Sequence, residues 1–255
     1  MDEFVAWVLC RAGLNSRSYR VQPLHRRIPA CLRALKAPSP LAARILIEHQ
    51  PHLLATAVSA LLIGVTEFFR DPFVFESIRT HVLPELAVRR KGLRVWSVAC
   101  SSGAELYSMA ILLSEAGLLE ESFLLGTDCR EDAIEQAREG LYDTEELSLL
   151  PPALRRAYFT AQAGMFRPVR ALRAKTVWKV ADVLNGPEQG PWDIILWRNA
   201  AIYLNPTAAA SVWRDLAPIL APGGILVSGK AERPPADVYC TGMSRCLYHT
   251  KEKYR

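Results

Sequence analysis

The spacing of hydrophobic residues divides the chain into two parts near residue 93. In the first part apolar residues recur every three or four positions, which predicts short helices at 2–12, 20–36, 40–48 and 51–62. In the second part short apolar runs alternate with helical stretches. Because strands that alternate with helices form parallel sheets, this pattern predicts a doubly wound α/β fold.

The elements of the second part follow one another in a regular order. The expected strands span 93–99, 122–128, 176–182, 192–198, 224–229 and 246–252, and the expected helices span 104–116, 130–139 and 206–219. Residues 143–175 fit neither period and predict an insertion of a helix and short hairpins. We therefore expect a small N-terminal helical domain, residues 1–72, and an α/β domain, residues 73–255, that carries this insertion.

Composition narrows the class of protein. The chain has 255 residues, 50% of them hydrophobic, which is enough to bury a large core. No apolar run reaches the ~18 residues of a membrane-spanning helix, and the N-terminus carries acids where a secretory signal carries Lys or Arg. We expect a cytoplasmic protein without membrane insertion. The six cysteines lack metal-ligand spacing, so reduced thiols and no metal site are expected.

The positive charge is concentrated at the N-terminus. Residues 1–40 hold seven Lys or Arg and two acids, which accounts for the whole net charge of +5. Such a segment favours an acidic partner, which is a nucleic acid, a membrane surface or an acidic protein. A solvated helix face explains the same charges equally well.

The turn after the first expected strand indicates the ligand. A strand that leads through a small-residue turn into a helix directs backbone N–H groups to one place, which suits an anion or a nucleotide-like ligand. The turn "ACSSGAE" has a single glycine, Gly103, and lacks both the dinucleotide fingerprint and the phosphate-loop Lys. A pyrophosphate is therefore a poor ligand for it.

Three carboxylates follow the expected strands in order. Asp128 ends the second strand, where α/β nucleotide sites place an acceptor for two ribose hydroxyls, and Asp182 follows the third, where it can accept from an adenine amino group. Glu105 opens the first helix and can face a cation. Each acid taken alone is better explained as a helix N-cap or as a partner of the helix dipole. Together they predict a nucleoside without phosphate, a description that S-adenosylmethionine (SAM) meets.

Several longer stretches resemble one family, the CheR chemotaxis-receptor glutamate methyltransferases. The similar stretches are "VTEFFRDPFVFESIR" (65–79), "VWSVACSSGAELYS" (95–108), "LLGTDCREDAIEQAREGLYD" (124–143), "WRNAAIYLN" (197–205) and "LAPGGILVSGKAE" (220–232). The resemblance implies a Rossmann-like class I SAM-dependent methyltransferase with a seven-stranded sheet, the N-terminal helical domain, and a small antiparallel β-subdomain inserted at 143–175. It also implies methyl transfer to glutamate side chains of an acidic helical chemoreceptor, with S-adenosylhomocysteine (SAH) as product.

The resemblance also implies roles for individual residues. The implied active-site residues are Arg70, Arg198 and Tyr203; the residues expected around the cofactor are Ala99, Gly103, Glu105, Asp128, Asp182, Val183 and Asn199; and those expected to meet the receptor are Arg20, Arg26, Arg27 and Arg33. A monomer with no nucleic-acid partner is expected. Because the acceptor is already an anion, alignment by a guanidinium and a phenol replaces a metal or a strong base.

The sequence departs from the family pattern at several positions. Ala104 and Leu106 flank Glu105 where Glu and Pro are usual, and Gly64 stands where Asn is common. Arg130 replaces the second Asp of "TDxD". The remaining changes are Asp182 for Asn and Lys230-Ala231 for His-Ser. Two alternatives therefore stay open, a SAM- or SAH-binding regulator with reduced turnover and a methyltransferase for another protein or a small molecule.

Overall fold

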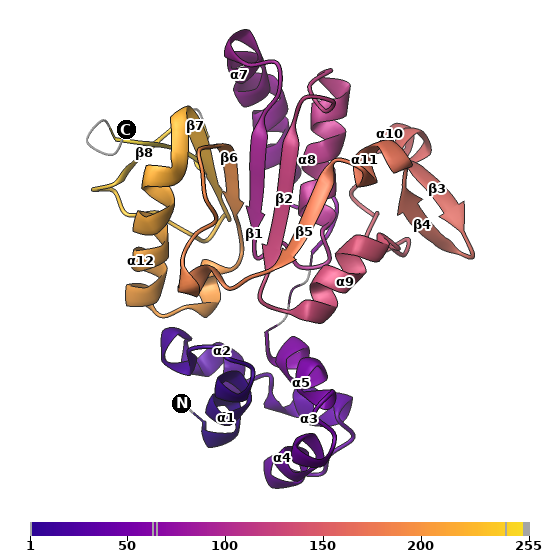
Figure 1. Ribbon diagram of the computed structural model, residues 1–255, viewed down its shortest axis with the longest axis vertical. Helices are drawn as coiled ribbons and strands as arrows, with labels where there is room; N and C mark the ends of the chain where they lie inside the picture. The colour runs from indigo at the N-terminus through magenta and orange to yellow at the C-terminus, as the bar shows by residue number, and fades with distance from the viewer. Residues whose placement is uncertain (1, 63, 65, 243, 252–255) are drawn as a thin grey trace.

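A seven-stranded sheet forms the centre of the protein, and the N-terminal helices lie beneath one end of it (Figure 1). The computed structural model describes residues 2–62, 64, 66–242 and 244–251. The strands of the sheet are β1 (Arg94–Val98), β2 (Phe123–Asp128), β5 (Thr176–Val180), β6 (Trp192–Trp197), β7 (Leu220–Ser228), β8 (Tyr239–Thr241) and β9 (Leu247–Thr250).

The strand order is β5-β2-β1-β6-β7-β9-β8. The first five strands are parallel, β9 runs antiparallel to β7, and β8 runs antiparallel to β9. The α/β prediction is confirmed, although the sheet is mixed rather than wholly parallel. Strand β8 was not predicted, because its three residues are too few to show a period. Residue 252, the last of the expected strand 246–252, lies outside the described residues.

The two faces of the sheet bury separate cores. Successive side chains of a strand point to opposite faces, so Val95 and Ile194 pack in one core while Trp96 and Ile195 pack in the other. Helices cover both faces, and for this reason the strands read as continuous apolar runs. This double burial fixes the register of the strands and the positions of the loops that follow them.

Helices connect the strands in the expected places. They are α8 (Ala104–Glu115), α9 (Glu131–Glu139) and α12 (Pro206–Leu216), and the insertion holds α10 (Pro152–Tyr158), a two-stranded hairpin of β3 (Phe159–Gln162) and β4 (Met165–Pro168), and α11 (Arg170–Arg173). One region differs from the prediction. Helices α6 (Pro72–Ser77) and α7 (Leu83–Arg89), joined by a π-helical turn, occupy a stretch for which the pattern predicts no element.

The N-terminal segment is helical, as predicted, with one correction. Its helices are α1 (Glu3–Arg11), α2 (Val21–His25), α3 (Ile28–Ala34), α4 (Pro40–His49) and α5 (Leu53–Leu61). The expected single helix 20–36 is wrong, because the chain breaks at Arg26 and Arg27 into α2 and α3. Pro29 explains the break, since its ring would collide with the carbonyl of residue 25 in a continuous helix.

Backbone hydrogen bonds fasten these helices to the sheet region. The Arg20 N–H donates to the Tyr203 carbonyl at 2.8 Å, and the Asn205 N–H donates to the Ser18 carbonyl at 2.8 Å. Within the described ranges no helix combines the length and the apolar character that crossing a bilayer requires.

Candidate active site

A cavity of about 280 Å³ lies at the carboxyl ends of β1, β2, β5 and β6. Strand β1 has β2 on one side and β6 on the other, so the order of the sheet reverses here, which is where α/β sheets bind ligands. The predicted site residues that line the cavity are Arg70, Ala99, Glu105, Asp128, Asp182, Val183, Arg198, Asn199 and Tyr203. Residues 132 positions apart in sequence, such as Arg70 and Ile202, thus face the same space.

Gly103 lies outside the lining of this cavity. Its φ of 89° allows the tight turn into α8, and a Cβ added there would lie 2.6 Å from the Trp178 ring. The turn also uses its N–H groups internally, because Gly103 N–H donates to the Cys100 carbonyl and Ser101 N–H donates to Asp128 Oδ2 at 2.9 Å. The glycine therefore shapes the turn, and the bonded N–H groups do not form an anion site.

Asp128 and Arg130 form a buried ion pair at the end of β2. Arg130 Nε donates to Asp128 Oδ1 at 3.1 Å and Nη2 donates to Oδ2 at 3.3 Å, while Nη2 also reaches Ser101 Oγ at 3.1 Å. The side chain of Arg130 is 10% exposed and that of Asp128 is 5% exposed. Burial alone would lower the pKa of Arg130, but the adjacent carboxylate outweighs burial and the pKa is raised.

Asp182 approaches the same cavity from the end of β5. Its Oδ1 accepts the Leu184 N–H at 3.0 Å, and Val183 and Leu184 add apolar surface beside it. Burial raises the pKa of this carboxyl, the Leu184 N–H opposes that shift, and the negative charge of Asp128 adds to it. A charged acceptor beside apolar side chains suits the amino edge and the face of an adenine ring.

Arg198 links three segments at the other end of the cavity. Its Nη1 donates to Glu105 Oε2 at 3.0 Å, and its Nη2 donates to the Arg70 carbonyl at 2.7 Å and to Asp71 Oδ2 at 2.9 Å. The side chain is 1% exposed. The other oxygen of Glu105 accepts from Ser97 Oγ at 2.8 Å. Glu105 is therefore held in place by two donors with one edge toward the cavity.

The turn that brings Asp71 to Arg198 has a strained backbone. Phe69 and Asp71 adopt φ of 56° and 60°, values that side chains other than glycine rarely adopt. Asp71 also pairs with Lys230, which follows β7. Backbone strain of this kind persists only where surrounding contacts fix it, and here those contacts are the ion pairs of Asp71.

Glu232 holds the loop that carries Asn199 and Tyr203. Its Oε2 accepts the Asn199 N–H and the Gly229 N–H, both at 2.8 Å. Burial raises the pKa of Glu232, and these backbone hydrogen bonds oppose the shift. Asn199 has a φ of 57°, so the carboxylate stabilises a left-handed turn. Sequence reasoning did not include Glu232, since only its packing reveals this role.

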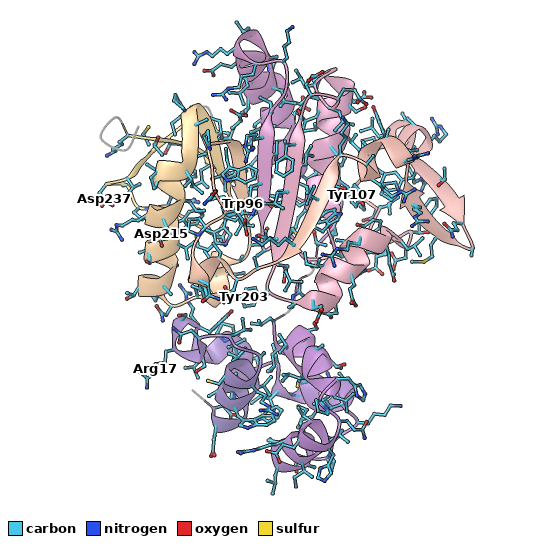
Figure 2. All side chains as sticks on the ribbon, viewed as in Figure 1. Arg17, Trp96, Tyr107, Tyr203, Asp215 and Asp237 are labelled. Carbon is cyan, nitrogen blue, oxygen red and sulfur yellow. The ribbon has the colours of Figure 1, made fainter. Side chains whose placement is uncertain are left out.

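The N-terminal segment also closes the cavity. Tyr19 lines it, and burial raises the pKa of the Tyr19 hydroxyl, with further contributions from Cys129, Asp182 and Asp128. Tyr203 lies where the sheet region meets the N-terminal helices (Figure 2). Tyr19 was not predicted as a site residue, because a lone aromatic residue in a basic loop gives no sign of which cavity it will meet.

The four arginines expected to meet the receptor differ in exposure and contacts. Arg20 Nε donates to the Leu204 carbonyl at 2.8 Å, and the half-buried Arg27 donates to the Ala60 carbonyl at 3.3 Å. Arg26 and Arg33 are exposed. In the part of the chain that the structure describes, neither of these two forms an ion pair. Within the same residues, no group of three or more His, Cys, Asp or Glu side chains is placed to hold a metal ion.

Residues 64–243 match the family model described as CheR methyltransferase, SAM binding domain. The chain is 31% identical to Chemotaxis protein methyltransferase 1 of Vibrio cholerae, over 78% of this chain and 75% of that protein. It is 31% identical to the chemotaxis protein methyltransferase of Vibrio parahaemolyticus, over 76% and 74%. It is 34% identical to that of Salmonella typhimurium, over 69% and 62%.

Solved structures of other methyltransferases are more distant. The structure of PKMT2 from Rickettsia typhi in complex with AdoHcy is 14% identical, covers 65% of this chain and 26% of that chain, and gives a TM-score of 0.40. At this distance the strand order and the family match, rather than the superposition, assign the Rossmann-like methyltransferase fold.

Proposed function

Because the chain belongs to the CheR methyltransferase family, we propose that it transfers the methyl group of SAM to glutamate side chains of a chemoreceptor-like protein. The observation that carries this proposal is that one cavity gathers Asp128 from the end of β2, Glu105 from the start of α8 and Arg198 from the end of β6. SAM supplies a methyl group already activated by the positive charge on its sulfur. The protein therefore has to bind, orient and desolvate, and it needs no metal for these tasks.

The proposed cofactor residues divide the cavity into two ends. Asp128 accepts the two ribose hydroxyls, and Asp182 with Val183 receives the adenine. Glu105 faces the cationic amino group, and Ala99 and Asn199 line the space between the ends. The fit rests on the donor set, since these carboxylates suit a neutral ribose and a cation and would repel phosphates.

The acceptor carboxylate is proposed to lie between Arg70 and Tyr203. Both residues line the cavity and are half-buried, so they face ligand and solvent at once. A guanidinium and a phenol hydroxyl can each donate to one carboxylate and aim its free oxygen. Arg198 has both Nη atoms committed to the protein. We therefore propose that Arg198 holds Glu105 and Asp71 in place. Only the N–H groups that these contacts leave over can donate to the acceptor.

The docking surface is proposed to be the outer side of α2 and α3. Arg26 and Arg33 are exposed there and suit the acidic helices of a receptor signalling domain, whereas Arg20 and Arg27 also anchor the fold. The same proposal includes a cytoplasmic, monomeric enzyme. It also includes a helical domain at 1–72 and a SAM-binding domain at 73–255, into which 143–175 is inserted.

One experiment tests the proposed function directly. The protein is incubated with methyl-labelled SAM and with receptor signalling domains encoded in the same genome, and base-labile label on the receptor is counted. The expected result is label on glutamates that disappears when those residues are changed to alanine. SAH binding without label on any receptor would instead support the regulator, and label on another protein or on a small molecule would support a different acceptor.

A further inference from the structure

Every acceptor position of the Asp128 carboxylate is filled by the protein itself. Oδ1 accepts the Arg130 N–H at 3.0 Å and Arg130 Nε at 3.1 Å, and Oδ2 accepts the Ser101 N–H at 2.9 Å and Arg130 Nη2 at 3.3 Å. An ionised carboxylate offers about four lone-pair positions. Two of the four positions are held by backbone N–H groups of the turns, and the other two by the guanidinium of a single side chain, Arg130.

The space that Arg130 occupies exists because residue 64 is glycine. A Cβ built on Gly64 would collide with Arg130 Nη2 and with Ser101 Oγ. Ser101 Oγ in turn donates to the Gly64 carbonyl at 2.8 Å. The two departures from the family pattern, Gly64 and Arg130, are thus physically coupled, since the guanidinium lies where a side chain of residue 64 would be.

A second cavity adjoins the first and shares Arg130 as part of its wall. It has a volume of about 250 Å³ and is lined by polar groups that include Asp132, Gln136 and Glu146. Arg130 and Asp132 line this cavity together, and the charge of Asp132 adds to the raised pKa of Arg130. Burial raises the pKa of Glu146. A guanidinium that leaves Asp128 therefore finds two carboxyl groups in the neighbouring cavity.

We propose that Arg130 determines the affinity for the cofactor, because its guanidinium occupies the two positions on Asp128 that the ribose hydroxyls require. Binding of the ribose then displaces the guanidinium into the cavity lined by Asp132 and Glu146. The inference rests on the proposed role of Asp128 as the ribose acceptor. It makes Arg130 a residue that weakens cofactor binding, the opposite of what a cation beside a ligand usually does.

The test compares Arg130→Met with the natural protein. Calorimetry is expected to show SAH binding tighter by about tenfold or more, because Arg130 makes two competing charged hydrogen bonds to Asp128 and a gain of ~1.4 kcal/mol is already tenfold. Competition with labelled SAH then measures the affinities of both proteins for adenosine and for 2′,3′-dideoxyadenosine. The gain is expected for adenosine and is absent for the dideoxy compound, which has no hydroxyl to place on Asp128.

Two further variants serve as controls. Arg138→Met removes the same charge from α9, the helix that Arg130 precedes, and Arg138 lines neither cavity, so this variant is expected to leave the SAH affinity within about twofold of the natural protein. Arg130→Lys keeps the charge but has no fork to reach both oxygens, so an intermediate gain is expected. If Arg130→Met fails to fold, the SAH affinity of Arg130→Lys tests the inference in its place.

Unchanged or weaker SAH binding by folded Arg130→Met would overturn the inference, and so would an equal gain for adenosine and its dideoxy analogue. Asp128→Ala separates this failure from that of the proposed cofactor site. If Asp128→Ala loses SAH while Arg130→Met gains nothing, the site stands and the competition is wrong. If neither variant changes the affinity, the ribose does not lie at Asp128.

Discussion

Two arginine–carboxylate groups lie in one cavity and are built differently. Arg198 is 1% exposed and binds Asp71 and Glu105, which are 127 and 93 positions away in sequence. Arg130 is 10% exposed and binds Asp128, two positions away. The first group joins distant segments through contacts that form only when the whole domain folds. The second is a local pair at the end of one strand.

The difference decides which group can give way to a ligand. Removing Arg198 would take the guanidinium away from Glu105 and Asp71, two largely buried carboxylates, and would leave Asp71 paired with Lys230, so the contacts of Arg198 are fixed by the fold. Arg130 can exchange Asp128 for Asp132 or Glu146 with little change elsewhere, because Arg130 lines both cavities, Asp128 lines the first, and Asp132 and Glu146 line the second. The distant group thus sets the geometry of the reacting end, and the local group adjusts the affinity at the ribose end.

Replacing Arg198 should produce the largest effect. Arg198→Met leaves Glu105 and Asp71 without their shared partner, and we expect a loss of about 3–5 kcal/mol in the free energy of unfolding. Methyl transfer should fall by about 100-fold or more, since misplacement of Glu105 disturbs alignment. Urea unfolding and transfer of labelled methyl groups measure the two quantities. A variant with natural stability and turnover would show that the distant group is not a structural link.

Replacing Asp128 comes next. Asp128→Ala removes the acceptor of both ribose hydroxyls, and because hydrogen bonds to a charged group are worth ~1.5–3 kcal/mol each, the SAH dissociation constant should rise at least about tenfold. Asp128→Asn should cost less, since its amide oxygen still accepts. Calorimetry on the folded variants measures both dissociation constants. Binding within about twofold of the natural protein would remove Asp128 from the site.

Much of this architecture follows from sequence, because strand-end carboxylates in a parallel sheet must meet at one edge. The order of elements, the cavity edge and the position of Asp128 could all be predicted from period and spacing. The partners of Asp128 could not. That Arg130 folds back on a residue two positions earlier depends on the space left by Gly64, which is 66 positions away in sequence.

Other misses have similar physical causes. In the sequence, Arg198 is indistinguishable from an unpaired cation at the end of a strand. Its burial between Glu105 and Asp71 depends on the strained turn at residues 69–71. Tyr19 enters the cavity only because the N-terminal segment pairs with the loop after β6. Such contacts join segments whose local patterns carry no information about each other, so no reading of a single segment could predict them.

The exposed cations of the N-terminal helices offer a smaller test. In contrast to Arg130 and Arg198, the side chains of Arg26 and Arg33 face solvent. Changing both to Glu should raise the receptor KM by about fivefold at low salt and less at high salt, because exposed pairs contribute up to ~1 kcal/mol and are screened. SAH affinity should not change.

The matched control for this test lies at the opposite end of the sheet. Arg89 and Lys91 are exposed beside the start of β1, away from α2 and α3 (Figure 1). Changing these two to Glu alters the net charge equally and should leave the receptor KM unchanged. If both double variants lower activity alike, overall charge rather than a docking surface attracts the receptor.

Acidification should reveal the smallest effect, at the adenine end. Burial raises the pKa of Asp182, so this carboxyl takes up its proton at a higher pH than an exposed aspartate. An adenine amino group prefers the ionised form, and SAH affinity should therefore fall as the pH drops through that raised value. The fall is limited to about threefold, because a protonated carboxyl keeps one carbonyl acceptor.

The control variant Asp182→Asn cannot titrate and should lack this part of the pH dependence, while the part due to other groups remains. Calorimetry of both proteins from neutral pH down to about pH 4, close to the ordinary pKa of an aspartate, gives the difference. Identical pH profiles would show that Asp182 does not contact the ligand, whereas a difference of the opposite sign would mean that the ligand prefers the protonated carboxyl.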